Sequence, residues 1–142
     1  MGAWCEYNGK EFSMSGECNA SLLSKYNIYN TDVSNPTAEF LAFAEILKIF
    51  PGINFRQSVV IVFHCDYVGM ENWMSLKWSA NKDYIQKIRD LCIMYIANIS
   101  CKVIIKHVKA HSGNFGNGKA DMLAGSLEHH NNFEELLRLL SE

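Results

Sequence analysis

The feature that most constrains the fold is an uninterrupted apolar run near the middle of the chain. Residues 58–63 read Ser-Val-Val-Ile-Val-Phe, so that β-branched side chains follow one another without a polar break. Such runs are typical of strands that are buried on both faces of a parallel sheet. Because parallel strands are joined by helical crossovers, the run predicts an α/β fold with a strand buried on both sides.

The segments around this run predict the remaining elements. Residues 3–7 and 11–14 are predicted to form a hairpin, because Asn8-Gly9 between them is the strongest short-range turn signal. Residues 19–35 are polar and are predicted to be an irregular connection. Apolar periodicity predicts a second strand over 102–108 and helices over 38–50, 67–73, 84–99, 117–128 and 133–140. We expect an α/β domain spanning residues 1–142, with a mixed sheet flanked by helices.

Composition limits the partners and the cellular setting. The chain is 49% hydrophobic and 20% charged, which is typical of a globular domain. Its net charge is −2, so contact with nucleic acid must come from a local basic patch. The five cysteines are odd in number and follow no secretory segment, which predicts reduced thiols in the cytoplasm or nucleus. No apolar run is long enough for a membrane span.

Candidate functional groups follow the two predicted parallel strands, where such sheets usually bind ligands. After the first strand come His64, Cys65 and Asp66, and along the second strand and beyond it lie His107, His111, Asn114, Asn117 and Asp121. Carboxylates and a histidine meeting at a strand end can hold Mg²⁺ and support phosphoester hydrolysis. Adjacent strand residues point to opposite faces, so His64 and Cys65 are not predicted to form a thiolate-imidazole pair.

Each candidate also has an ordinary structural interpretation. Glu39, on the first predicted helix, can be a first-turn acid that complements the helix dipole. Asp121 can be a helix-surface acid, and His111 can be a loop histidine that is hydrogen-bonded to the backbone. Composition alone leaves both interpretations open.

Three motifs in the expected order resemble the type 1 ribonuclease H family over residues 2–127. Residues 34–42 resemble its Thr-Asn-Asn-x-Ala-Glu helix start, and residues 60–68 resemble its strand ending in Thr-Asp-Ser-x-Tyr-Val. Residues 105–124 resemble its histidine loop and its Asn-x-x-Ala-Asp-x-Leu-Ala helix. The resemblance implies a ribonuclease H-like fold that recognises RNA–DNA hybrids. Members cut the RNA strand with two metal ions held by an Asp-Glu-Asp-Asp set.

The resemblance assigns roles to particular residues. Glu39 and Asp121 match metal ligands, and His111 matches a loop histidine that assists proton transfer. Asp66, two residues beyond His64, can add a carboxylate if the strand stays extended that far, although the aligned position opens a helix in the family. The implied cofactor is Mg²⁺ or Mn²⁺ if the domain is active and none if it is not. The implied contacts with RNA–DNA hybrid are Asn35, Trp73, Lys77, Trp78, Lys82 and Asn114. Alternatively, Trp73 belongs to a helix core and the lysines are solvated surface.

Two departures from the family pattern reduce the carboxylate set. His64 stands where the family has its second Asp, and a neutral imidazole offers one nitrogen in place of two anionic oxygens. The family's first Asp lies on a strand that precedes the hairpin, and this sequence starts at the hairpin. Three explanations remain open: a start assigned too late, a degenerate gene product, or a rearranged sheet in which the hairpin pairs directly with the strand near Val59.

These departures lead to a functional expectation with two alternatives. We expect a hybrid-binding domain with impaired or lost hydrolysis, in which His64 is a weak substitute at a catalytic position. The alternatives are an active endoribonuclease and a protein-interaction module derived from the fold. Residues 22–31 also lengthen the connection before the first helix relative to the family.

Overall fold

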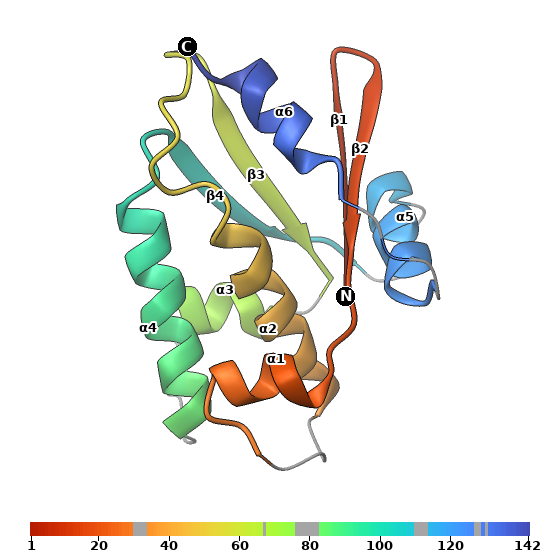
Figure 1. Ribbon diagram of the computed structural model, residues 1–142, viewed down its shortest axis with the longest axis vertical. Helices are drawn as coiled ribbons and strands as arrows, with labels where there is room; N and C mark the ends of the chain where they lie inside the picture. Colours follow the sequence, from red (N-terminus) through yellow and green to blue (C-terminus); the bar gives the residue numbers. More distant parts are fainter. Residues whose placement is uncertain (30–33, 67, 76–82, 110–113, 127–128, 130) are drawn as a thin grey trace.

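The computed structural model describes the chain except residues 30–33, 67, 76–82, 110–113, 127–128 and 130, and the side chains of residues 35, 68 and 71. Its described strands form an antiparallel hairpin of β1 (Gly2–Tyr7) and β2 (Lys10–Ser15), and a separate parallel pair of β3 (Val60–Cys65) and β4 (Lys102–His107). The helices are α1 (Ala20–Lys25), α2 (Asn35–Leu47), α3 (Val68–Met74), α4 (Asp83–Ala97), α5 (Phe115–Ala124) and α6 (Phe133–Leu140). The predicted α/β class, with small sheets flanked by helices, is confirmed (Figure 1).

The hairpin forms where the turn signal predicted it. Asn8 has a φ of 51° and Gly9 a φ of 78°, and a type I′ turn requires such positive values at both central residues. Helix α5 packs against β1 at Gly2, where an added Cβ would lie 2.6 Å from the Ala120 carbonyl oxygen. A residue without a side chain therefore allows the close approach that places α5, and with it Asp121.

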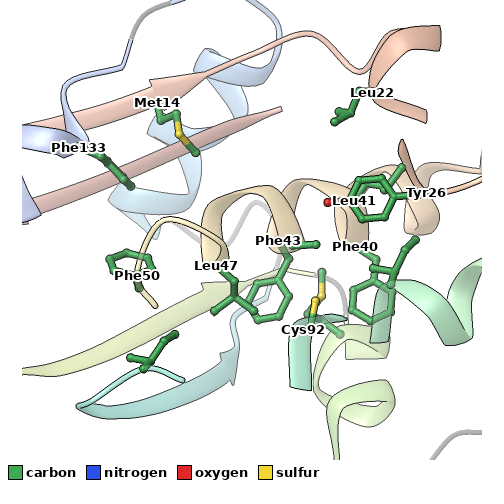
Figure 2. Close-up of a cluster of buried hydrophobic side chains, with 14 of the residues drawn as sticks. Met14, Leu22, Tyr26, Phe40, Leu41, Phe43, Leu47, Phe50, Cys92 and Phe133 are labelled. Carbon is green, nitrogen blue, oxygen red and sulfur yellow. The ribbon is translucent and has the colours of Figure 1, made fainter. Parts of the chain in front are cut away.

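Helix α2 forms the centre of the core. Ser34 caps its first turn by accepting a hydrogen bond from the Thr37 backbone N–H at 3.4 Å, and Pro36 lies in that turn. The Phe43 ring packs edge to face on Phe63 of β3, with centroids 5.1 Å apart. Figure 2 shows the buried side chains that α2 contributes: Phe40, Leu41, Phe43 and Leu47. Their burial fixes the helix, and so fixes the position of Glu39 on its more exposed side.

The prediction that residues 58–63 are buried on both faces is wrong. Ile61 and Phe63 pack against the core, whereas Val60 and Val62 are 49% and 39% exposed. Among the described residues, helices cover only one face of the β3–β4 pair, so alternate side chains of β3 remain in solvent. The hairpin does not pair with β3 in the described part of the chain, so the rearranged sheet is not observed.

Two helix predictions also need correction. Residues 19–35 are not irregular throughout, because Ala20–Lys25 form α1 with Leu22 and Leu23 buried. The Asn19 side chain accepts a hydrogen bond from the Leu22 backbone N–H at 3.0 Å and so caps this helix. Helix α5 begins at residue 115 and ends at 124, not at 117 and 128. No described helix has the length and apolar character that a bilayer span requires.

Helix α6 connects the hairpin to the segment that enters β3. At its start, the Asn132 side chain accepts a hydrogen bond from the Ser13 backbone N–H at 2.7 Å. At its end, the Leu140 carbonyl accepts one from the Arg56 backbone N–H at 2.9 Å. Figure 1 shows α6 between β3 and the hairpin. The helix therefore ties together two sheets that share no strand.

Candidate active site

Asp66 lies just beyond the carboxyl end of β3 and is held from two directions. Its carboxylate accepts a hydrogen bond from Asn117 Nδ2 at 3.3 Å. Its backbone carbonyl accepts one from His107 Nε2, at the end of β4, at 3.2 Å. The Val108 backbone N–H also donates to the Cys65 carbonyl at 2.8 Å, which continues the β3–β4 pairing past the strand ends. These bonds fix Asp66 at the carboxyl-terminal edge of the β3–β4 pair, where α/β folds usually bind ligands.

The Glu39 carboxylate of α2 is influenced by two carboxylates from other elements at this edge. Partial burial raises the pKa of Glu39 above its ordinary value, and the charges of Asp66 and then Asp121 raise it further. Glu39 is not in the first turn of α2, so the helix-dipole interpretation does not apply to it. Because nearby negative charges disfavour ionisation, this edge is a place where a bound cation would relieve repulsion.

His64 and Cys65 point to different sides of β3. His64 is exposed on the face that carries Val60 and Val62, whereas Cys65 packs towards the core. Burial raises the pKa of Cys65 to about 12, with smaller contributions from the charges of Asp66 and Glu39. The thiol is therefore protonated at neutral pH and is not a nucleophile. This agrees with the prediction that the two residues form no catalytic pair.

The carboxylates of Glu39, Asp66 and Asp121 have the chemistry that a divalent cation needs, but they are not grouped closely enough to hold one. Carboxylate oxygens are the ligands that Mg²⁺ and Mn²⁺ prefer. Within the described ranges, no group of three or more His, Cys, Asp or Glu side chains is close enough to hold a metal ion. Glu39 and Asp121 both reach solvent, so rotation about their side-chain bonds would not disturb the core. A metal would therefore require these side chains to turn towards each other.

The remaining predicted site residues have mixed placements. Trp73 is half-buried and stacks on Phe40, with ring centroids 5.0 Å apart and an interplanar angle of 22°, as the core interpretation expects. Asn114 caps α5 by accepting a hydrogen bond from the Asn117 backbone N–H at 2.8 Å. Contacts of either residue with nucleic acid remain predictions. The other predicted side chains lie outside the described part of the chain: Asn35, Lys77, Trp78, Lys82 and His111.

The supporting roles of Asn117 and His107 were not predicted. Both residues were noted near the site, but the sequence shows no partner for either. Asn117 precedes Asp121 by four residues on α5, a spacing that puts both side chains on one face of a helix. That spacing gives no signal for Asp66, the carboxylate that Asn117 contacts in the structure.

A protein-family model described as RNase H matches residues 5–128, which include Glu39, Asp66 and Asp121. The chain belongs to the RNase H family. Helix α6 lies beyond the matched range. Comparisons with curated proteins and with solved structures gave no match.

Membership of the RNase H family confirms the resemblance drawn from the three motifs. It also agrees with the observed architecture of small sheets flanked by helices. The family places the chain among nucleic-acid-binding domains of the ribonuclease H type. The matches of Glu39 and Asp121 to metal ligands, and of His64 to a position that carries Asp, remain predictions.

Proposed function

We propose that this RNase H domain binds RNA–DNA hybrids over the surface that presents Glu39, Asp66 and Asp121, and that it cleaves the RNA strand weakly or not at all. The observation that carries the proposal is the 3.3 Å hydrogen bond from Asn117 Nδ2 of α5 to the Asp66 carboxylate beyond β3. The charges of Asp66 and Asp121 also help to raise the pKa of Glu39 of α2. Residues from α2, the end of β3 and α5 are thus brought to one edge of the domain. That edge is the place expected for the hybrid and its metal ions.

Impaired hydrolysis follows from the number of carboxylates. The two-metal reaction of the family uses four of them, and the matched positions here supply Glu39 and Asp121. Asp66 would be a third ligand, because His64 projects from the exposed face of β3. A divalent cation supplies polarisation of a phosphoryl oxygen and a lowered pKa for bound water. Three carboxylates would hold two such ions less well than four.

The neighbouring residues would keep the weakened site in place. The Asn117 amide orients the Asp66 carboxylate, and His107 holds the Asp66 backbone from the end of β4. Asn114 caps α5, the helix that carries both Asn117 and Asp121. Asn117 and His107 would act on the carboxylate site, whereas Asn114 would in addition contact the nucleic acid.

The second candidate function is an active endoribonuclease for RNA–DNA hybrids. It is favoured by the hydrogen bond that holds Asp66 towards α5, since a fixed carboxylate there compensates in part for His64. Under this alternative, Asp66 is as necessary for cleavage as Asp121. Under the main proposal, cleavage is slow or absent and the contribution of Asp66 is to binding metal and hybrid.

The test measures binding and cleavage separately. Fluorescence anisotropy with RNA–DNA hybrid, duplex DNA and duplex RNA in Ca²⁺ gives the binding preference. Cleavage of a labelled hybrid in Mg²⁺ and then Mn²⁺ gives the activity. The variants are Asp66→Asn, Asp121→Asn and His64→Asp. Asp90→Asn on α4 is the matched control, because this acid is 72% exposed and is not among the three carboxylates.

We expect hybrid to bind more tightly than duplex DNA, and little cleavage by the unmodified chain or by His64→Asp, because residue 64 projects from the exposed face of β3. If the unmodified chain cuts the RNA strand and both Asp66→Asn and Asp121→Asn abolish cutting while Asp90→Asn does not, the domain is an active nuclease. If hybrid and duplex DNA bind equally, the main proposal is wrong.

A further inference from the structure

A second candidate site, lined by both polar and apolar residues, lies between α1, α2 and α4 in the lower half of Figure 1. It is a hollow of about 310 Å³, within the size range of small-ligand sites. We call it the lysine hollow. Its polar lining residues are Lys25, Tyr26, Glu45, Lys48, Lys87 and Tyr95.

Glu45, the acid among the described lining residues, is already paired. Glu45 is 7% exposed and accepts a hydrogen bond from the hydroxyl of Tyr26, itself 4% exposed, at 2.8 Å. Lys48 forms an ion pair with the same carboxylate. Burial and the neighbouring Glu45 raise the pKa of Tyr26 well above its ordinary value, so this hydroxyl stays a donor. Glu45 is therefore neutralised by Lys48 and is not free to balance the other lysines.

Lys25 and Lys87 have no counter-ion in the part of the chain that the structure describes. Neither forms an ion pair with any residue that the structure describes. They come from α1 and α4, so their approach is a result of the tertiary fold and not of sequence neighbours. An anion in the hollow would meet two positive charges that no described acid balances. The half-buried Tyr95 adds a hydroxyl to the same lining.

We propose that the lysine hollow binds a phosphate group. A phosphate offers several acceptor oxygens with negative charge, and lysine ammonium groups bind it as point charges. The group would come either from a small phosphate compound or from the backbone of a nucleic-acid strand. Lys25 and Tyr26 lie in residues 22–31, which lengthen the chain relative to the family pattern. The inference does not depend on Glu39, Asp66 or Asp121.

The test uses the whole chain and three ligands: inorganic phosphate, a nucleoside monophosphate and a single-stranded DNA oligonucleotide. Isothermal titration measures the affinity of each, and inorganic phosphate is also used to compete with bound oligonucleotide. The variants are Lys25→Gln, Lys87→Gln and the double change. The matched control is Lys102→Gln, an exposed lysine on β4 outside the hollow. Thermal unfolding checks that every variant is folded.

We expect each single change to weaken phosphate binding about tenfold, because each removes one charged hydrogen-bond donor. Lys102→Gln should leave the affinity unchanged. Competition between phosphate and the oligonucleotide assigns the site to a nucleic-acid backbone, and phosphate binding without competition assigns it to a small compound. The inference is overturned if the unmodified chain does not bind phosphate at millimolar concentrations, or if the folded double variant binds it as well as the unmodified chain. A loss in Lys102→Gln as large as in the double variant also overturns it.

Discussion

Replacement of Leu136 by alanine tests whether α6 is an integral part of the domain. Leu136 is 4% exposed and belongs to the same buried cluster as Met14 of the hairpin and Phe55 before β3. Because α6 bonds to both of these regions, weakening its packing should loosen the link between the two sheets. The family match ends at residue 128, so the match itself does not require this helix.

The magnitude follows from the burial of the side chain. Leucine to alanine at a buried position removes apolar contacts and leaves a cavity, which together cost about 2–5 kcal/mol. A domain of this size has a free energy of unfolding of about 5–15 kcal/mol. We expect the loss of unfolding free energy in Leu136→Ala to lie in the lower part of this range, because α6 lies at one side of the core and its neighbours can relax. The loss is nevertheless a large share of the total stability.

Urea unfolding followed by circular dichroism measures this loss, and the same helix offers a matched control. Leu139 is 40% exposed, so Leu139→Ala should cost less than about 1 kcal/mol. If both substitutions change the free energy of unfolding by the same small amount, α6 is not docked on the core. The proposed link between the hairpin and β3 would then be refuted.

Three further predictions concern buried polar groups, charge and helix propensity. Tyr26→Phe should lower the free energy of unfolding by about 1–3 kcal/mol, because the buried Glu45 loses a hydrogen-bond donor. In the same urea titration Tyr29→Phe should be neutral, because Tyr29 is 79% exposed. The raised pKa of Glu39 favours folding below its ordinary pKa, and this contribution is lost as the pH rises through the raised value. Glu39→Gln should therefore stabilise the domain at neutral pH, by less than about 1 kcal/mol because the group reaches solvent. In acid the substitution should have no such effect. Equal changes in the free energy of unfolding at both pH values would contradict this. Gly118→Ala, in α5, should raise the free energy of unfolding by about 0.5–1 kcal/mol, because alanine favours a helix more than glycine does and no atom lies within 4 Å of the added Cβ. A lower melting temperature would show that the helix needs glycine there.

The sequence alone determined the elements whose conformation depends on neighbouring residues. Asn8-Gly9 predicts the hairpin because these two residues adopt positive φ values at low cost. Ser34 and Pro36 start α2 for a similarly local reason, since a cap and a fixed φ act within one helical turn. The three motifs were also sufficient to identify the RNase H family, because their residues keep their order along the chain.

The tertiary structure decided what depends on distant segments. The apolar run predicts that Val60 and Val62 are buried, but both are exposed in the structure. Their exposure depends on whether another element covers that face of β3. Asp66 was a weaker candidate than His64 by sequence position, yet Asn117 of α5 and His107 of β4 hold Asp66 where its charge raises the pKa of Glu39. Lys25 and Lys87 are far apart in the chain and line one hollow only because α1 and α4 pack against α2. Spacing along a chain specifies which residues share a face of one element, whereas packing between elements decides which faces meet.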